Sequence, residues 1–77
     1  MNNIRRKKLK AVVDQLEICS SVVETLAREE EDYFNNMPEG IQESQKGEDA
    51  EENVSDLESA IESINEAIEQ IGSAISR

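Results

Sequence analysis

Hydrophobic residues recur every three or four positions along most of this chain of 77 residues. In the second half the spacing alternates strictly between four and three residues. A short motif also repeats there, as AIESINE, AIEQIGS and AIS. In the first half the same spacing is interrupted only at Glu30. The expected seam positions are Leu9, Val12, Leu16, Cys19, Val23, Leu26, Tyr33 and Met37, followed by Ala50, Val54, Leu57, Ile61, Ile64, Ile68, Ile71 and Ile75. A seven-residue hydrophobic period predicts α-helices that supercoil against other helices.

The two seams predict two helices within a single unit that spans residues 1–77. We expect a helix from about residue 3 to 34, a loop from about 35 to 46 and a second helix from about 47 to 76. Turn-forming residues fill the loop, and Ser44 is the expected N-cap of the second helix. Because the connection is short, the helices should be antiparallel. The predicted fold is all-α, an antiparallel two-helix hairpin that resembles a coiled coil.

Assembly of hairpins into a helical bundle is expected because one hairpin contact cannot cover every apolar residue. Outside the seams lie Val13, Ile18, Val22, Ala27 and Phe34 in the first helix and Ala60, Ala67 and Ala74 in the second. Isoleucine at both core positions favours three or four helices over two. One Phe, one Tyr and no Trp also leave little bulk for a core. We predict a homo-oligomer, a dimer or higher, whose simplest form is a dimeric four-helix bundle.

The charge of the chain is strongly acidic and unevenly placed. There are 18 acidic and 8 basic residues, which gives a net charge of −10. Every charged residue among residues 1–10, however, is basic. The overall field repels phosphates, so no direct nucleic-acid binding is expected. A single cysteine excludes an internal disulfide, and no apolar run is long enough for a signal sequence or a membrane span. These features predict a cytoplasmic protein with no membrane contact.

Catalytic chemistry has few residues available in this chain. There is no histidine, and Cys19 falls on an expected core position, so no nucleophile and base can be paired. Two Glu-x-x-Glu pairs, at 48–51 and 66–69, lie on one helix, whereas a metal site of that kind needs pairs facing each other across helices. We therefore expect no enzyme activity, no catalytic residue, no metal and no cofactor.

Two charged clusters are the candidate binding residues. The basic cluster, Arg5, Arg6, Lys7 and Lys8, is a candidate anion site in which several chains pool their cations around a phosphate. The acidic run 29–32 ends a helix, where acids oppose the dipole, which indicates a use at the surface. The candidate partner-binding residues are Glu29, Glu30, Glu31, Asp32, Asn36, Glu39, Gln42, Glu48 and Glu52. The alternative is that both clusters are ordinary solvated surface and bind nothing.

The segment YFNNMPEGIQES at 33–44 holds the only aromatic residues and the only proline. Tyr33 and Met37 continue the seam, and Phe34 and Ile41 would cover the open end of the bundle, so we favour a hydrophobic lid. A recognition surface made by the polar members of the segment, Gln42 among them, is the alternative.

Three passages characterise the chain: the basic start RRKKLKAVVDQLE, the loop N-M-P-E-x-[IL]-Q-x-S at 36–44, and the acidic helix EDAEENVSDLESAIESINEAI. In these passages the chain resembles a family of short acidic α-helical proteins from phages and prophages of Gram-positive bacteria. Members often have Glu-Arg after the serine, where this chain has Gln45 and Lys46. The resemblance implies a phage origin and no particular activity.

Three functions remain open at this point. A phage protein without catalytic residues is expected to act against host defence, here through its acidic surface on a host defence protein. Alternatively, the oligomer sequesters a small phosphate-bearing signalling nucleotide with the basic cluster, or serves as a structural or assembly accessory. The excess of carboxylates favours the host protein as partner, and we rank that function first. Each of the three would operate in the host bacterial cytoplasm.

Overall fold

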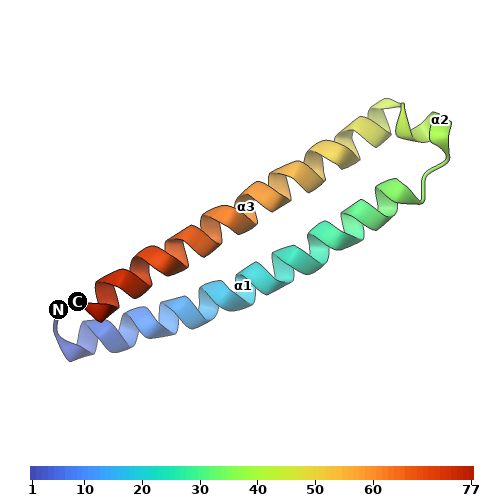
Figure 1. The fold of residues 1–77 in the computed structure, drawn as a ribbon. Helices are drawn as coiled ribbons and strands as arrows, with labels where there is room; N and C mark the ends of the chain where they lie inside the picture. The colour runs from blue at the N-terminus through green and yellow to red at the C-terminus, as the bar shows by residue number, and fades with distance from the viewer.

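The computed structural model describes all 77 residues and consists of two long helices packed side by side. Helix α1, Asn3–Asn35, and helix α3, Gln45–Ser76, run in opposite directions (Figure 1). A short helix α2, Glu39–Gln42, lies in the connection that joins them at one end. The molecule measures 58 × 15 × 13 Å, with both termini at one end and α2 at the other. The predicted all-α fold is confirmed. The helical turn α2 was not predicted, because the whole of 35–46 was expected to be loop.

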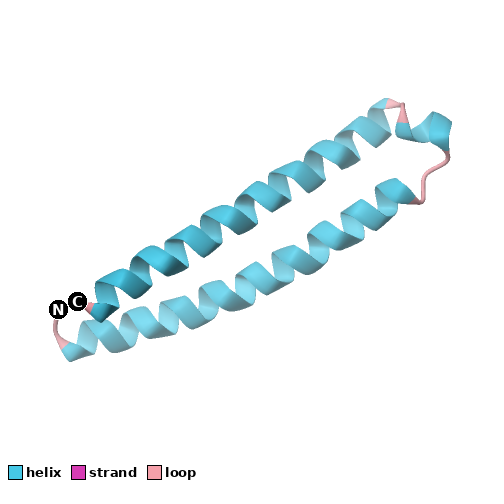
Figure 2. Ribbon diagram, in the orientation of Figure 1, coloured by secondary structure: helices cyan, strands magenta, loops and turns pink.

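Figure 2 shows that only short loops and chain ends lie outside the helices. Local hydrogen bonds set the helix ends. Asn2 caps α1, because its side-chain oxygen accepts a hydrogen bond of 2.8 Å from the Arg5 backbone N–H. Ser44 occupies the N-cap position of α3 as predicted, but its hydroxyl donates to the Ile41 carbonyl and does not cap the helix. Ser44 therefore ties α3 to the end of α2.

The inward side of α3 confirms the seam predicted from the sequence. Every predicted position is buried or half-buried: Ala50, Val54, Leu57, Ile61, Ile64, Ile68, Ile71 and Ile75. Gly47 extends this series toward α2 and is also buried. Ala60 is exposed, whereas Ala67 and Ala74 are half-buried on the flank of the seam. The regular isoleucine pattern therefore marks the side of α3 that packs on α1.

The prediction for α1 was wrong at every second seam position. Leu9, Leu16, Val23 and Met37 are half-buried as expected. The other four are exposed, with exposed fractions of 40% for Val12, 50% for Leu26 and 44% for Tyr33, and Cys19 is exposed too. Their places are taken by the residues one position later: Val13, Ser20, Ala27 and Phe34. The seam of α1 is thus shifted by one residue at these four positions, and in the middle of the helix the shift brings in the small side chains of Ser20 and Ala27.

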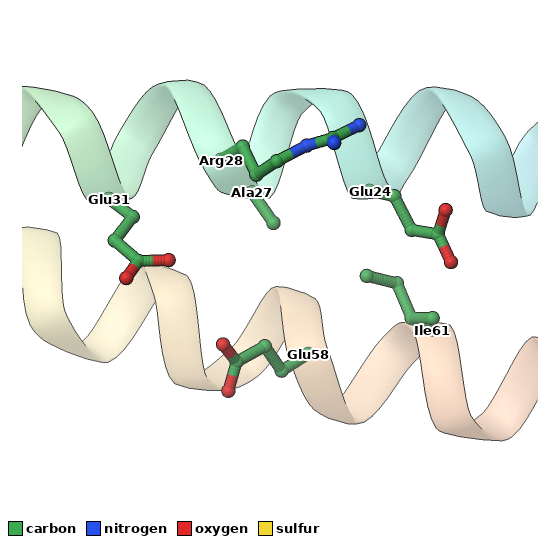
Figure 3. Close-up of a pocket in the computed structure, with 6 residues that line it drawn as sticks. All are labelled: Glu24, Ala27, Arg28, Glu31, Glu58 and Ile61. Atoms are coloured by element: carbon green, nitrogen blue, oxygen red, sulfur yellow. The ribbon is translucent and has the colours of Figure 1, made fainter.

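This shift has a steric reason. The side chains that α3 presents are mostly isoleucine and leucine, which occupy much of the space between the helices. Ser20 and Ala27, each 6% exposed, leave room for them, and Ala27 points at Ile61 across the interface (Figure 3). Close packing of large against small residues is a general feature of helix interfaces. Hydrophobicity alone favours Val12 and Leu26, which is why the sequence pattern misplaced the seam.

The interior of the single hairpin is thin. Only four residues are buried, namely Ser20, Ala27, Gly47 and Ala50, and no large side chain is completely buried. One of the four is polar, since the Ser20 hydroxyl donates a hydrogen bond of 3.2 Å to the side-chain oxygen of Asn65. A chain of this size with so few buried residues gains little hydrophobic stabilisation by itself.

Candidate binding surfaces

The two sides of the helix pair differ sharply in chemistry. Residues seven apart share one side of a supercoiled helix. Glu31 of α1 and Glu58 of α3 line one pocket together, so the acidic residues at seven-residue spacings from them lie on that side. We call this side the acidic face. Its residues are Glu17, Glu24 and Glu31 of α1 with Glu51 and Glu58 of α3.

The centre of the acidic face is an open pocket of about 280 Å³ between the two helices. Figure 3 shows Glu24 and Glu31 projecting from α1 and Glu58 from α3, around a floor formed by Ala27 and Ile61. A second pocket of about 220 Å³ continues toward α2, where Glu51 joins the carboxylates of Glu31 and Glu58 above Phe34 and Val54. The two pockets form one groove with an apolar floor and acidic walls.

One cation belongs to this groove. Arg28 lines the first pocket, and Figure 3 shows its side chain extended along α1 toward the Glu24 side. Three carboxylates surround the pocket against this single guanidinium, so the groove keeps an excess of negative charge. A lysine or arginine with its aliphatic stem on the apolar floor and its head between carboxylates matches such a surface.

The opposite side of the hairpin is largely uncharged. The Lys46 ammonium lies 5.8 Å from the centre of the Tyr33 ring. These two residues, one in the first turn of α3 and one in the last turn of α1, therefore share a side. Residues at seven-residue spacings from them share it too. We call this the apolar face, and it consists of Val12, Cys19, Leu26 and Tyr33 of α1 with Ala60, Ala67 and Ala74 of α3. The same spacings place Arg5 at its end near the chain termini and Asn53 and Lys46 at its end near α2. The predicted core position of Cys19 is thus an exposed surface position.

The structure does not gather the basic cluster into one site. Arg6 is half-buried, and its Nε donates a hydrogen bond of 3.1 Å to the Ile75 carbonyl at the end of α3. Arg5, Lys7 and Lys8 are exposed, and consecutive helical residues point about 100° apart. Arg6 therefore joins the two chain ends together, and its three neighbours spread around α1.

The predicted acidic candidates also separate. Glu30 is half-buried and accepts a hydrogen bond of 2.8 Å from the Asn53 amide. Glu31 lines the groove, whereas Glu29 and Asp32 are exposed elsewhere on the helix. On α3, Glu48 and Glu52 line a shallow groove of about 470 Å³ made by that helix alone. Of the acidic residues in the run 29–32, only Glu31 lines the acidic groove, whereas Glu30 meets α3 outside it through Asn53.

The segment at 33–44 combines packing with exposure. Phe34 and Met37 are half-buried, but Tyr33 and Ile41 are 44% and 43% exposed, so the segment closes the end of the hairpin only in part. Gln42, expected at a recognition surface, is half-buried and donates a hydrogen bond of 3.0 Å from its side-chain amide to the Phe34 carbonyl.

The polar candidates of this segment therefore divide. Asn36 and Glu39 remain exposed, and Asn36 lines an open pocket of about 450 Å³ with Tyr33, Met37 and Ile41.

Four groove residues were missed by sequence reasoning: Glu24, Arg28, Glu51 and Glu58. The signal was the spacing of Glu17, Glu24 and Glu31, which repeats every seven residues beside the seam. This spacing indicates a groove only when the seam of α1 is assigned correctly. A shift of the seam by one residue changes where these acids lie relative to α3.

No family model, no curated protein and no solved structure matches the chain. None of its helices combines the length and apolar character that crossing a membrane requires. No cluster of three or more histidine, cysteine or acidic residues is arranged to hold a metal ion.

Proposed function

We propose that this chain is a non-catalytic binding protein whose acidic face engages a basic surface of another protein. The resemblance to phage proteins favours a host defence protein as that partner, in the host bacterial cytoplasm. Binding at this surface would block the basic groove of the partner, in the way that a nucleic-acid mimic does.

The observation that carries this proposal is the convergence of carboxylates from both helices on one groove. Glu24, Glu31 and Glu58 surround an apolar floor, and Glu51 extends the series. A charge run on one helix is the ordinary solvated surface of a helical protein. Acids from two helices that meet over apolar side chains offer both charge and contact area to a cationic side chain.

Self-association into a helical bundle is part of the same proposal. The hairpin buries only four residues and leaves Val12, Leu26 and other apolar side chains exposed on the face opposite the acidic groove. Covering the apolar face with further copies would leave the acidic face free on the outside of the bundle. Sedimentation at micromolar concentration tests this part, and a stable monomer would contradict it.

The acidic groove is tested by charge removal at constant shape. The first variant carries Glu24→Gln, Glu31→Gln and Glu58→Gln, which neutralise the groove. The matched control carries Glu62→Gln, Glu66→Gln and Glu69→Gln, which neutralise three carboxylates that line a surface groove on α3 alone. Both variants change the net charge equally.

Calorimetry measures how strongly each variant binds an arginine-rich peptide. The groove variant should bind the peptide at least tenfold more weakly than the control, because it loses charge-assisted contacts that carry roughly 1.5–3 kcal/mol each. Equal weakening in both would show a diffuse charge effect and remove the assignment of the groove.

The same titration includes signalling nucleotides. The structure favours them less, because Arg6 is engaged by the Ile75 carbonyl and its neighbours diverge. Nucleotide binding that Lys8→Glu abolishes and the groove variant retains would replace the proposed function. Binding of neither probe would leave the structural or assembly accessory as the function.

A further inference from the structure

We propose that the apolar face binds the same face of a second copy in an antiparallel arrangement, so that the α2 end of one hairpin lies beside the chain ends of the other. This inference rests on the self-association proposed above and adds the interface, the orientation and the register. The occupant of the face is a second copy of this chain, related by a two-fold axis that crosses the hairpin near its middle.

The apolar content of the face is concentrated on α1. Beside Val12 and Leu26, the adjoining positions Ile18 and Val22 are 65% and 52% exposed. Ile18, Val22 and Leu26 follow at intervals of four, so their side chains adjoin along one side of the helix. They form a continuous exposed strip where an isolated soluble hairpin would carry polar residues.

The side of the molecule that carries the apolar face is large enough for a dimer. The whole side measures 58 by 15 Å and projects about 900 Å², and a stable interface takes roughly 800 Å² from each partner. The polar residues at both ends of this side must therefore take part in the contact together with the apolar face. The α3 half of the face is lined by Ala60, Ala67 and Ala74, whose small side chains allow a second helix to approach closely. Hairpin and partner would then form a bundle of four long helices.

Charge decides the orientation. Near the chain ends the edges of the face carry Lys8 on α1 and Arg77 after α3, with Arg5 on the face itself. Near α2 the same two edges carry Glu29 and Asp49, with the single cation Lys46 between them, so the chain ends are the more basic end of the face. The members of each pair are whole heptads apart along one edge, so they border the same face. A parallel dimer would put like charges together at both ends. The antiparallel dimer places basic ends beside acidic ends, which is favourable at separations within a Debye length of about 8–10 Å.

The register follows from the extent of the apolar residues on α1. The face runs from Val12 to Tyr33, so its centre lies between residues 22 and 23. A two-fold axis at that centre brings Val12 opposite the partner's Tyr33 and Cys19 opposite the partner's Leu26. The same axis pairs Ala60 with the partner's Ala67 on α3.

The native cysteine makes this register directly testable. In Leu26→Cys protein, each Cys19 would face the new thiol of the partner, and mild oxidation should link most of the chain into a covalent dimer. The two thiols within one helix are seven residues apart, about 10 Å along the axis, which is too far for a disulfide. Intramolecular closure therefore does not compete with the cross-link.

Two matched controls fix the interpretation. Wild type has only Cys19, and the double variant Cys19→Ser with Leu26→Cys has only the new thiol. In the proposed register, identical thiols from the two copies are separated by about 10 Å along the helices, so neither control should cross-link efficiently. Efficient linkage of either control would overturn the register.

Sedimentation and salt dependence separate the remaining outcomes. A dimer by sedimentation that no thiol pair links would overturn the interface while the self-association stands. A monomer by sedimentation would overturn both. Each copy carries a net charge of −10, so added salt also screens a repulsion that is the same in either orientation. The orientation is therefore tested by comparing wild type with Lys8→Gln protein, which lacks one basic end charge. Relative to this variant, the wild-type dimer should lose stability as salt is added, because the end-to-end attraction is screened. A relative gain with salt would show that like ends meet and would overturn the orientation.

Discussion

The carbonyl oxygen of Gln42 occupies the place where a side chain on Gly47 would begin, so the start of α3 rests directly on the backbone of α2. The same Gln42 reaches back through its side-chain amide to the Phe34 carbonyl at 3.0 Å. One residue thus connects the end of α1 with the start of α3. The direction in which α3 leaves the loop depends on this contact, and with it the pairing of residues along the hairpin.

The first prediction concerns the close approach at Gly47. Gly47→Ala should lower the free energy of unfolding by about 1–3 kcal/mol, because the new methyl group meets backbone atoms that can yield only by moving the loop. Gly72→Ala is the control, since a Cβ at Gly72 meets no atom within 4 Å. It should stabilise α3 by up to about 1 kcal/mol through helix propensity. Urea denaturation of both variants measures the difference, and equal stabilisation would contradict the contact.

The second prediction concerns the hydrogen bond from Gln42 to Phe34. Gln42→Leu keeps the approximate size of the side chain and removes its donor, so it should lower the free energy of unfolding by about 1 kcal/mol. The control Gln70→Leu changes an exposed glutamine on α3 and should alter stability by less than about 0.5 kcal/mol. Thermal melting of the two variants tests the prediction. A Gln42→Leu protein that melts like its control would return Gln42 to the candidate recognition residues.

The third prediction separates the two sides of α1 with a pair of leucines. Leu16 is half-buried in the seam, so Leu16→Ala should lower the free energy of unfolding by about 1–2 kcal/mol at every protein concentration. Leu26 is 50% exposed on the apolar face. Leu26→Ala should therefore lower the free energy of unfolding mainly at protein concentrations where copies associate. Denaturation at several protein concentrations distinguishes the two. Equal losses in dilute solution would restore the seam predicted from the sequence.

The fourth prediction concerns the junction of the chain ends at Arg6. Arg6→Gln replaces the guanidinium that donates to the Ile75 carbonyl with a shorter, neutral amide. It also removes a favourable positive charge at the C-terminus of α3. The last turn of α3 should then exchange its amide hydrogens faster, with a loss of about 0.5–1.5 kcal/mol in local stability. Lys7→Gln removes an exposed neighbouring charge and should leave this exchange unchanged. Hydrogen exchange measured by NMR compares them, and a matching response in both would show that Arg6 acts only through its charge.

The sequence by itself determined the number of long helices, their antiparallel pairing and the side of α3 that packs inward. These features depend on local quantities: a seven-residue period, turn-forming residues and a short connection. The aliphatic series from Val54 to Ile75 allows only one inward side, because the rest of α3 is polar, alanine or glycine. The structure confirms that side of α3.

Only the tertiary structure decided which side of α1 meets α3, and therefore which residues form the acidic face and the apolar face. Helix α1 carries apolar residues both at Val12 and Leu26 and at Val13 and Ala27, so its pattern fits two orientations one residue apart. The choice depends on the volume left between α3 side chains, which favours Ser20 and Ala27 over the larger alternatives. That volume is a property of the helix pair and cannot be obtained from the pattern of either helix alone.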